Sequence, residues 1–306
     1  MKRLKLTLLV AATGLLVACA GDKELQTAPE SVLLHRAQTY LKDENYAQAI
    51  KYLNALNGRF PRTIYSQQTQ IELIYAYFEN KEYDKASWAA DTFMRYFRNA
   101  PHSDYVLYLA GLAKEVPNDH WVQELFGVDQ ANHDSASMQS ALQDYQMLVA
   151  AFPNSPYTPD ALQRIKYIYS QLARHEVNIA KFYAKRNAWV AVANRLVAVQ
   201  RQYPLTKAAV ESLPLLKEAY EQMNLPKLAA DTEALIKAES GAAKKAPDIQ
   251  KPGEPKNIFP PQWVKLPPMP SEEMIEKMEA ENALHADDYV PEQPEQSLKK
   301  EKLTDD

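Results

Sequence analysis

AQTYLKDENYAQAIKYLNALNGRFP, residues 37–61, decides the fold, because its small, aromatic and proline residues recur along the chain. In the next stretch the matching positions hold Ile74, Tyr77, Tyr83, Ala86 and Phe97. Two later units carry the same pattern, with Ala141, Tyr145, Leu148, Phe152 and Pro153 in one and Ala180, Tyr183, Trp189, Leu196, Tyr203 and Pro204 in the other. Such a recurrence is typical of TPR repeats, in which two antiparallel helices occupy about 34 residues.

Each position in this pattern has a physical reason. Small residues such as Ala37 and Ala49 suit places where the two helices of a hairpin cross closely, while Tyr40 and Tyr46 fill the gap to the next hairpin. Pro61 ends the second helix, because proline lacks a backbone donor and disfavours helix in the residue before it. A single hairpin cannot bury its own apolar face, so neighbours must stack. We therefore predict an all-α, right-handed TPR-like solenoid of about five helical hairpins over residues 30–240.

The later repeats are irregular. We predict that the third repeat begins with a helix near residues 104–115, with Gly111 in the small position, and that an insertion over residues 116–135 separates its two helices. Residues 159–186 contain no internal helix breaker, so one long helix is expected there. A fifth hairpin is predicted over residues 206–238.

The first 18 residues have the features of a signal peptide. A basic start is followed by an apolar run of about 12 residues and by the small residue Ala18, as in secretory signals. A membrane-spanning helix needs about 20 residues, so a permanent transmembrane anchor is not expected. We predict that residues 1–18 are removed.

The residues Leu16-Val17-Ala18-Cys19 resemble the lipobox of bacterial lipoproteins, in which cleavage precedes the cysteine. The resemblance implies an S-diacylglycerol and an N-acyl chain on Cys19, followed by a linker over residues 19–29. Three acyl chains hold a protein on a membrane permanently, whereas one holds it marginally. Ala20, which stands where an aspartate favours the inner membrane, implies an outer-membrane protein that faces the periplasm. The alternative is an ordinary signal peptide with a chance cysteine.

Composition argues against several other classes of function. The formal net charge is −4, which does not suit a nucleic-acid binder. Cys19 is the only cysteine, so stability must come from packing rather than from an internal disulfide. The six histidines show no metal-ligand spacing, and we find no phosphate loop, serine elbow or paired-carboxylate motif. We therefore predict a protein that is not an enzyme and that carries no cofactor besides the lipid on Cys19.

The composition changes at Gly241. Half of the 20 prolines follow it, large aliphatic residues are few, and Lys, Glu and Asp are common. We predict that the tail, residues 241–306, is mostly disordered, and that its deletion would hardly change the melting temperature. A short helix from Ser271 to about His285 is possible, with Ser271 as its cap. The stretch Phe259-Pro260-Pro261-Gln262-Trp263 is either a polyproline ligand or a linker with two exposed aromatic residues.

Several motifs resemble the outer-membrane assembly lipoprotein family called BamD. The family-specific ones are the Tyr-Ser-Gln-Gln stretch at 65–68 and the insertion with Phe-Gly-Val-Asp at 126–129 that ends in Asp134, since generic TPR proteins lack both. Three further stretches match: Asp104-Tyr105-Val106, Pro153-Asn154-Ser155, and Ala188-Trp189-Val190-Ala191-Val192 with Asn194-Arg195. The likeness runs from about residue 30 to residue 238, and the tail departs from it.

The resemblance implies membership of the machinery that folds β-barrels into the outer membrane. In that family, C-terminal repeats dock on the POTRA domains of the barrel assembly subunit, N-terminal repeats are thought to receive unfolded outer-membrane protein precursors, and other assembly lipoproteins bind nearby. Phe60 and Tyr65 match the position where a precursor strand could be held. Arg195, with Asn194, matches the family's contact with the barrel subunit.

Alternatives exist for these residues and for the function. Phe60 could serve packing as well as precursor binding, and Arg195 could be a solvated helix charge. Another periplasmic TPR lipoprotein, serving cell-wall synthesis or division, would share the repeats and the anchor. An enzyme such as a wall hydrolase would need a cleft with clustered titratable groups, for which the sequence offers no candidate.

Overall fold

The computed structural model describes residues 23–115, 135–239, 249–255 and 258–283, and it contains no strand within these ranges. The predicted all-α class is therefore confirmed for this part of the chain. Cys19 and the signal peptide, and the insertion residues 116–134 with the Phe-Gly-Val-Asp motif, lie outside the described residues. None of the described helices is both long and apolar enough to cross a membrane.

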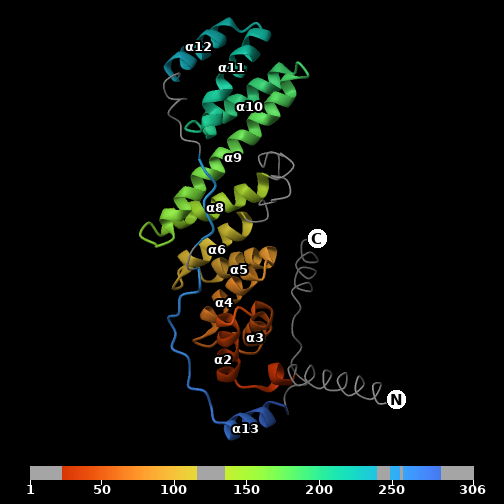
Figure 1. Cartoon of the computed structure of the whole chain (residues 1–306), viewed down its shortest axis with the longest axis vertical. Helices are drawn as coiled ribbons and strands as arrows, with labels where there is room; N and C mark the ends of the chain where they lie inside the picture. Colours follow the sequence, from red (N-terminus) through yellow and green to blue (C-terminus); the bar gives the residue numbers. More distant parts are fainter. Residues whose placement is uncertain (1–22, 116–134, 240–248, 256–257, 284–306) are drawn as a thin grey trace, which may run out of the picture. The chain divides into compact units, whose positions relative to one another are not determined.

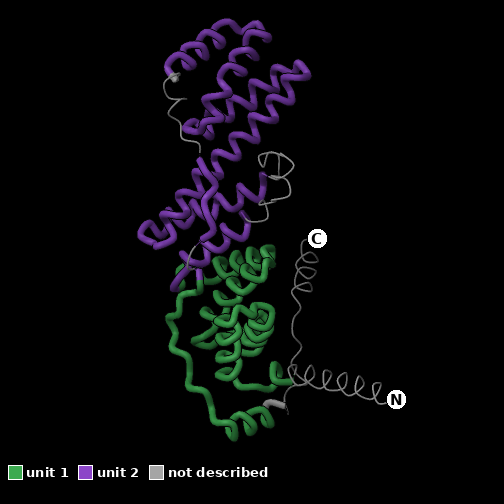
Figure 2. The backbone as a smooth tube through the Cα atoms, viewed as in Figure 1, with its two compact units in different colours: residues 1–100, 259–306 green, residues 101–258 purple. Residues whose placement is uncertain are grey.

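The chain forms two compact units (Figure 2). Unit 1 comprises residues 1–100 and 259–306, and its helices are α2 (Glu30–Lys42), α3 (Tyr46–Arg59), α4 (Ser66–Glu79), α5 (Tyr83–Tyr96) and α13 (Glu272–Ala283). Unit 2 comprises residues 101–258, and its helices are α6 (Ser103–Glu115), α8 (Ser135–Ala151), α9 (Thr158–Ala184), α10 (Trp189–Gln202), α11 (Lys207–Gln222) and α12 (Pro226–Glu239).

Within each unit, helices pack in chain order as hairpins (Figure 1). In unit 1, α2 pairs with α3 and α4 with α5, and α3 packs on α4. In unit 2 the pairs are α6 with α8, α9 with α10 and α11 with α12, joined by α8 on α9 and α10 on α11. The predicted third-repeat helix, the long helix and the fifth hairpin correspond to α6, α9 and the pair α11–α12. The TPR-like arrangement is therefore confirmed, while its handedness stays a prediction.

The turns inside four hairpins share one backbone geometry. Each contains a non-glycine residue with positive φ, between 56° and 62°: Glu44, Lys81, Asn187 and Asn224. The residue that follows donates its N–H to a tyrosine carbonyl in the last turn of the first helix, at 2.8–3.1 Å; these carbonyls belong to Tyr40, Tyr77, Tyr183 and Tyr220. A left-handed residue with a bond that reaches back over the last turn is the usual way to close a helix. The repeated tyrosines therefore mark the end of each first helix.

The aromatic–proline pairs close the second helices, as predicted. Phe60 and Tyr203 leave the helical conformation, with φ near −130°, because each precedes a proline. Their carbonyl oxygens accept hydroxyl donors from the start of the next helix, Ser66 at 3.1 Å and Thr206 at 2.8 Å. Phe152 does the same with Thr158 at 2.8 Å. One short motif thus ends one helix and fixes the start of the next.

The small positions lie where helices touch. Ala37 and Ala49 are fully buried. At Gly111 of α6 the ring of Tyr145 from α8 lies so close that a Cβ atom would stand 2.4 Å from a ring carbon. Because Tyr145 is itself fully buried, its ring has no room to retreat. The packing reason predicted for Gly111 is therefore confirmed.

Part of the tail lies among the described residues. Residues 249–255 and 258–271 contain no helix or strand, and α13 follows with Ser271 capping it through a 3.4 Å bond from the Met274 N–H. The tail is held by side chains of the helical hairpins, for example by Arg164, which donates to the Gly253 carbonyl at 2.9 Å. Composition alone could not indicate this order, because the tail supplies mostly backbone acceptors and the hairpins supply the donors. Because such bonds hold the described tail residues, we now expect deletion of residues 241–306 to lower the melting temperature.

Candidate functional site

Phe60 and Tyr65 lie together in the connection between α3 and α4. Both side chains are half-buried, and the Arg59 guanidinium lies over the Phe60 ring, 4.9 Å from its centre. Ile64, between them in the chain, is 74% exposed, which is unusual for a large aliphatic residue. We call Phe60, Ile64 and Tyr65 the loop patch. Sequence analysis identified the aromatic pair but missed Ile64, although an aliphatic residue in a short polar loop was a visible signal.

A network of hydrogen bonds fixes the shape of this loop. The Ser66 hydroxyl accepts the Thr63 N–H at 2.8 Å while donating to the Phe60 carbonyl. The Thr63 hydroxyl donates to the Glu30 carboxylate at 2.6 Å, which ties the loop to the start of α2. The loop patch is therefore presented by a rigid support, as binding surfaces require.

Arg195 and Asn194 lie on α10. Asn194 is exposed, whereas Arg195 is partly buried and pairs through Nη1 with the Glu176 carboxylate of α9 at 2.7 Å. Val190 and Val197, one helical turn to either side of Asn194, are 64% and 43% exposed. Together Val190, Asn194 and Val197 form what we call the α10 stripe, which runs along one face of the helix. The sequence indicated Arg195 correctly as a surface cation but could not reveal its intrachain partner.

The most buried charges of unit 2 form a network around Arg164 of α9. The guanidinium contacts Glu115 of α6 at 3.0 Å and Asp160 at 2.5 Å. Two tyrosine hydroxyls donate to the same carboxylates, Tyr145 to Glu115 at 2.7 Å and Tyr108 to Asp160 at 2.6 Å. Burial raises the pKa of Tyr145 well above 10, so its hydroxyl remains a donor. The network joins α6, α8 and α9, so its geometry serves cohesion of the unit.

Unit 1 contains a second buried polar cluster, centred on Glu72 of α4. Its Oε1 atom accepts bonds from the amides of Gln38, Gln68 at 2.7 Å, and Gln262 of the tail at 2.9 Å. Its Oε2 atom has no hydrogen-bond partner among the described residues. Burial raises the pKa of Glu72 to about 7, although the three amide bonds act to lower it. Gln68 belongs to the Tyr-Ser-Gln-Gln motif, and Gln262 to the proline-rich stretch, so the structure brings two predicted motifs together.

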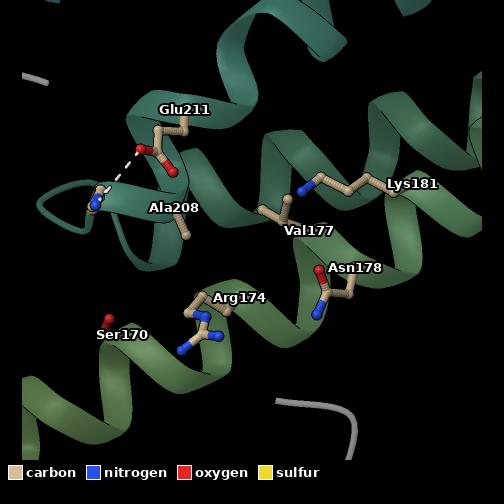
Figure 3. A pocket seen from close by; sticks show the side chains of 8 residues that line it. Ser170, Arg174, Val177, Asn178, Lys181, Ala208 and Glu211 are labelled. Atoms are coloured by element: carbon tan, nitrogen blue, oxygen red, sulfur yellow. Dashed lines mark ion pairs between the residues drawn. The ribbon is translucent and has the colours of Figure 1, made fainter. Parts of the chain in front are cut away.

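A cavity of about 390 Å³ lies between α9 and the start of α11 (Figure 3). Its lining combines Ser170, Arg174, Val177, Asn178 and Lys181 of α9 with Lys207, Ala208 and Glu211 of α11. Lys207 and Glu211 stand 4.0 Å apart as an ion pair. The described residues contain no group of three His, Cys, Asp or Glu side chains placed to hold a metal ion. The cavity therefore offers mixed charge, from three basic side chains and one carboxylate.

The family match covers all five hairpins. The model of the YfiO family, described as an outer membrane lipoprotein, matches residues 26–235. The outer membrane protein assembly factor BamD of Pasteurella multocida is 46% identical over 260 residues, which span 85% of this chain and 99% of that protein. The chain belongs to the BamD family. BamD of Haemophilus influenzae is 43% identical over 256 residues, or 83% of this chain and 97% of that protein.

More distant BamD proteins also match over most of the chain. BamD of Neisseria meningitidis serogroup B is 36% identical over 241 residues, which cover 76% of this chain and 90% of that protein. The resemblance drawn from the motifs is therefore confirmed. The match to the family model ends at residue 235, so the tail lies outside the part that defines the family.

Proposed function

We propose that this chain is a scaffold of the machinery that assembles β-barrels in the outer membrane. The observation that carries the proposal is the family match over residues 26–235, which includes both binding surfaces described above. The protein acts by binding and positioning, without nucleotide, metal or any cofactor beyond the lipid on Cys19. It is held on the periplasmic side of the outer membrane by that lipid, and its partners there are the barrel assembly subunit, other assembly lipoproteins and unfolded precursors.

The α10 stripe and Arg195 are the proposed contact for the POTRA domains of the barrel assembly subunit. Two exposed valines supply apolar area, and Asn194 supplies an amide between them. Only Nη1 of Arg195 is used by Glu176, and a guanidinium has five N–H donors. The remaining donors can form a second charge-assisted pair with a carboxylate of the partner.

The loop patch is the proposed contact for unfolded precursors. Phe60, Ile64 and Tyr65 place three apolar side chains on one rigid loop. Precursors of β-barrels carry alternating apolar residues on extended segments, and such segments bind through successive apolar contacts.

Reversing the charge at residue 195 tests the proposed POTRA contact. Arg195→Glu would place a second carboxylate beside that of Glu176 and remove the guanidinium donors, so the barrel assembly subunit should bind about tenfold more weakly. Binding of the purified subunit to the purified protein would be measured by calorimetry. Lys166→Glu, an equal change in charge at an exposed position of α9, is the matched control and should leave the affinity unchanged. Unaltered binding by the Arg195 variant, with normal helical content, would place the contact elsewhere.

Removing the lipid acceptor tests the proposed anchor. Cys19→Ser abolishes thioether formation, so the protein should move from the membrane fraction to the soluble periplasmic fraction. Fractionation of cells followed by detection of the protein measures this distribution. A serine variant that still sediments with the outer membrane would show that the anchor is not the lipid on Cys19.

A further inference from the structure

The tail forms an extended segment beside α2 and α4 within unit 1 (Figure 2). Its residues 258–271 contain no helix or strand and carry five prolines. Prolines hold a chain extended before it binds, which lowers the entropy lost on binding. The segment therefore resembles an extended peptide ligand, although it belongs to the same chain as the helices that it contacts.

One side chain of α4 recognises the backbone of this segment. The Gln68 amide nitrogen donates to the Pro261 carbonyl at 3.1 Å, and the Gln68 amide oxygen accepts the Trp263 N–H at 3.4 Å. A carbonyl and an N–H two residues apart are common to every extended chain, whatever its side chains. Gln68 is thus suited to holding extended segments of differing sequence.

Neighbouring residues contact the side chains of the segment. The rings of Tyr75 and Phe259 meet edge to face with centroids 5.5 Å apart, and the Gln262 amide bonds to both Glu72 and Gln38. We call Gln38, Gln68, Glu72 and Tyr75 the tail-binding face. Gln38 and Gln68 both donate to the Glu72 carboxylate, so this part of the face is connected without the tail.

Two side chains of the tail segment stay accessible to solvent in this contact, although Pro260 between them is buried. Phe259 is 39% exposed, and Gln262 is also exposed despite its hydrogen bonds. A segment tethered to its own receptor experiences an effective concentration in the millimolar range, so a weak intrinsic contact can fill the site and still be displaced.

We propose that the tail-binding face is a receptor for an extended, aromatic-bearing segment of an unfolded precursor, and that residues 259–263 occupy it in cis as a built-in competitor. This inference rests on the proposed function for the identity of the client. The tail raises the concentration at which a client fills the site, and a client that binds releases the tail. The match to the family model ends at residue 235, before the residues of this competitor.

The test uses a fluorescent synthetic peptide with the sequence of residues 256–266, added to the full-length protein and followed by fluorescence anisotropy. The wild-type chain should bind it weakly, because its own tail fills the face. The double variant Phe259→Ala/Gln262→Ala loses the cis contacts made by side chains of the tail and keeps only those of its backbone, so it should bind the peptide about tenfold more tightly. Met269→Ala, a tail change at an exposed residue, is the matched control and should behave as wild type.

Adding Gln68→Met to the double variant should remove the gained affinity, with circular dichroism to confirm that helical content is kept. An unlabelled peptide from the C-terminal strand of an outer-membrane barrel should compete with the labelled peptide. Equal affinity of wild type and double variant would overturn the cis competitor, even if the barrel subunit binds normally. Tight binding of the tail peptide without competition by the barrel peptide would overturn the precursor as client. If the proposed scaffold role is wrong, the wild-type protein will instead show no binding of the barrel assembly subunit in the calorimetric experiment.

Discussion

Replacing Arg164 by methionine should lower the free energy of unfolding by about 3–5 kcal/mol, the usual cost of removing one partner from a buried ion pair. The arginine side chain is 5% exposed and Glu115 is 9% exposed, so water cannot replace the lost partner. The substitution also removes the donor to the Gly253 carbonyl, which is one of the bonds that hold the tail in unit 2. Methionine keeps most of the volume, so the loss measures charge pairing rather than a cavity.

Denaturant unfolding followed by circular dichroism would measure this change. Arg201→Met, at an exposed position of α10, is the matched control and should alter the unfolding free energy by less than about 0.5 kcal/mol. The double variant Arg164→Met/Glu115→Gln should recover part of the loss, because it no longer buries an unpaired carboxylate. A single variant as stable as the control would mean that the network contributes nothing to cohesion.

The local architecture was predictable from the sequence because its causes are local. The tyrosine carbonyl at Tyr40 closes the first helix of its hairpin, and the same bond recurs one repeat later at Tyr77. Proline after Phe60 ends the second helix through a clash with its immediate neighbour. Gly111 could be assigned to a helix crossing since it occupies the position of an alanine in other repeats. Each of these inferences uses residues that lie within one hairpin or one repeat.

The polar networks were not predictable, because their members meet only after hairpins stack. Arg164 and Glu115 are separated by a whole helix and an insertion, and nothing in either local sequence indicates the other. The same holds for Gln262, whose partners in α2 and α4 lie near the other end of the chain. A proline-rich, polar tail looks disordered when only its own residues are considered, since the donors that fix it belong to other segments.

The candidate binding residues fall between these two cases. Phe60 and Tyr65 were predicted as a pair from the resemblance, and the structure places them on one rigid loop together with Ile64. The exposed position of Asn194 follows from the periodicity of α10. The pairing of Arg195 with Glu176 depends on how α9 packs against α10, which the repeat pattern alone does not specify.

Stability should fall as pH rises through the titration of Glu72. The carboxyl has an ordinary pKa of 4.5, and burial raises it to about 7 in the folded protein. The folded state therefore binds the proton more tightly than the unfolded state, so the contribution of this group is fully present below pH 4.5 and is lost as pH rises to about 7. A shift of this size corresponds to at most about 3 kcal/mol.

Glu72→Gln isolates this contribution, because glutamine resembles the protonated acid and cannot ionise. Its amide oxygen can still accept the bonds from Gln38, Gln68 and Gln262. The unfolding free energies of the variant and the wild type would be measured by denaturant unfolding between pH 4.5 and 8. All other groups titrate alike in the two proteins, so their contributions cancel when one free energy is subtracted from the other. The variant should therefore become more stable than the wild type by up to about 3 kcal/mol as pH rises to about 7, and the difference should stay constant above that pH. A difference that does not vary with pH would show that water reaches Oε2 and that Glu72 titrates as it does in the unfolded chain. In that case the Gln262 amide would bond to a solvated carboxylate, and competition with water would leave that bond a small net contribution to holding the tail.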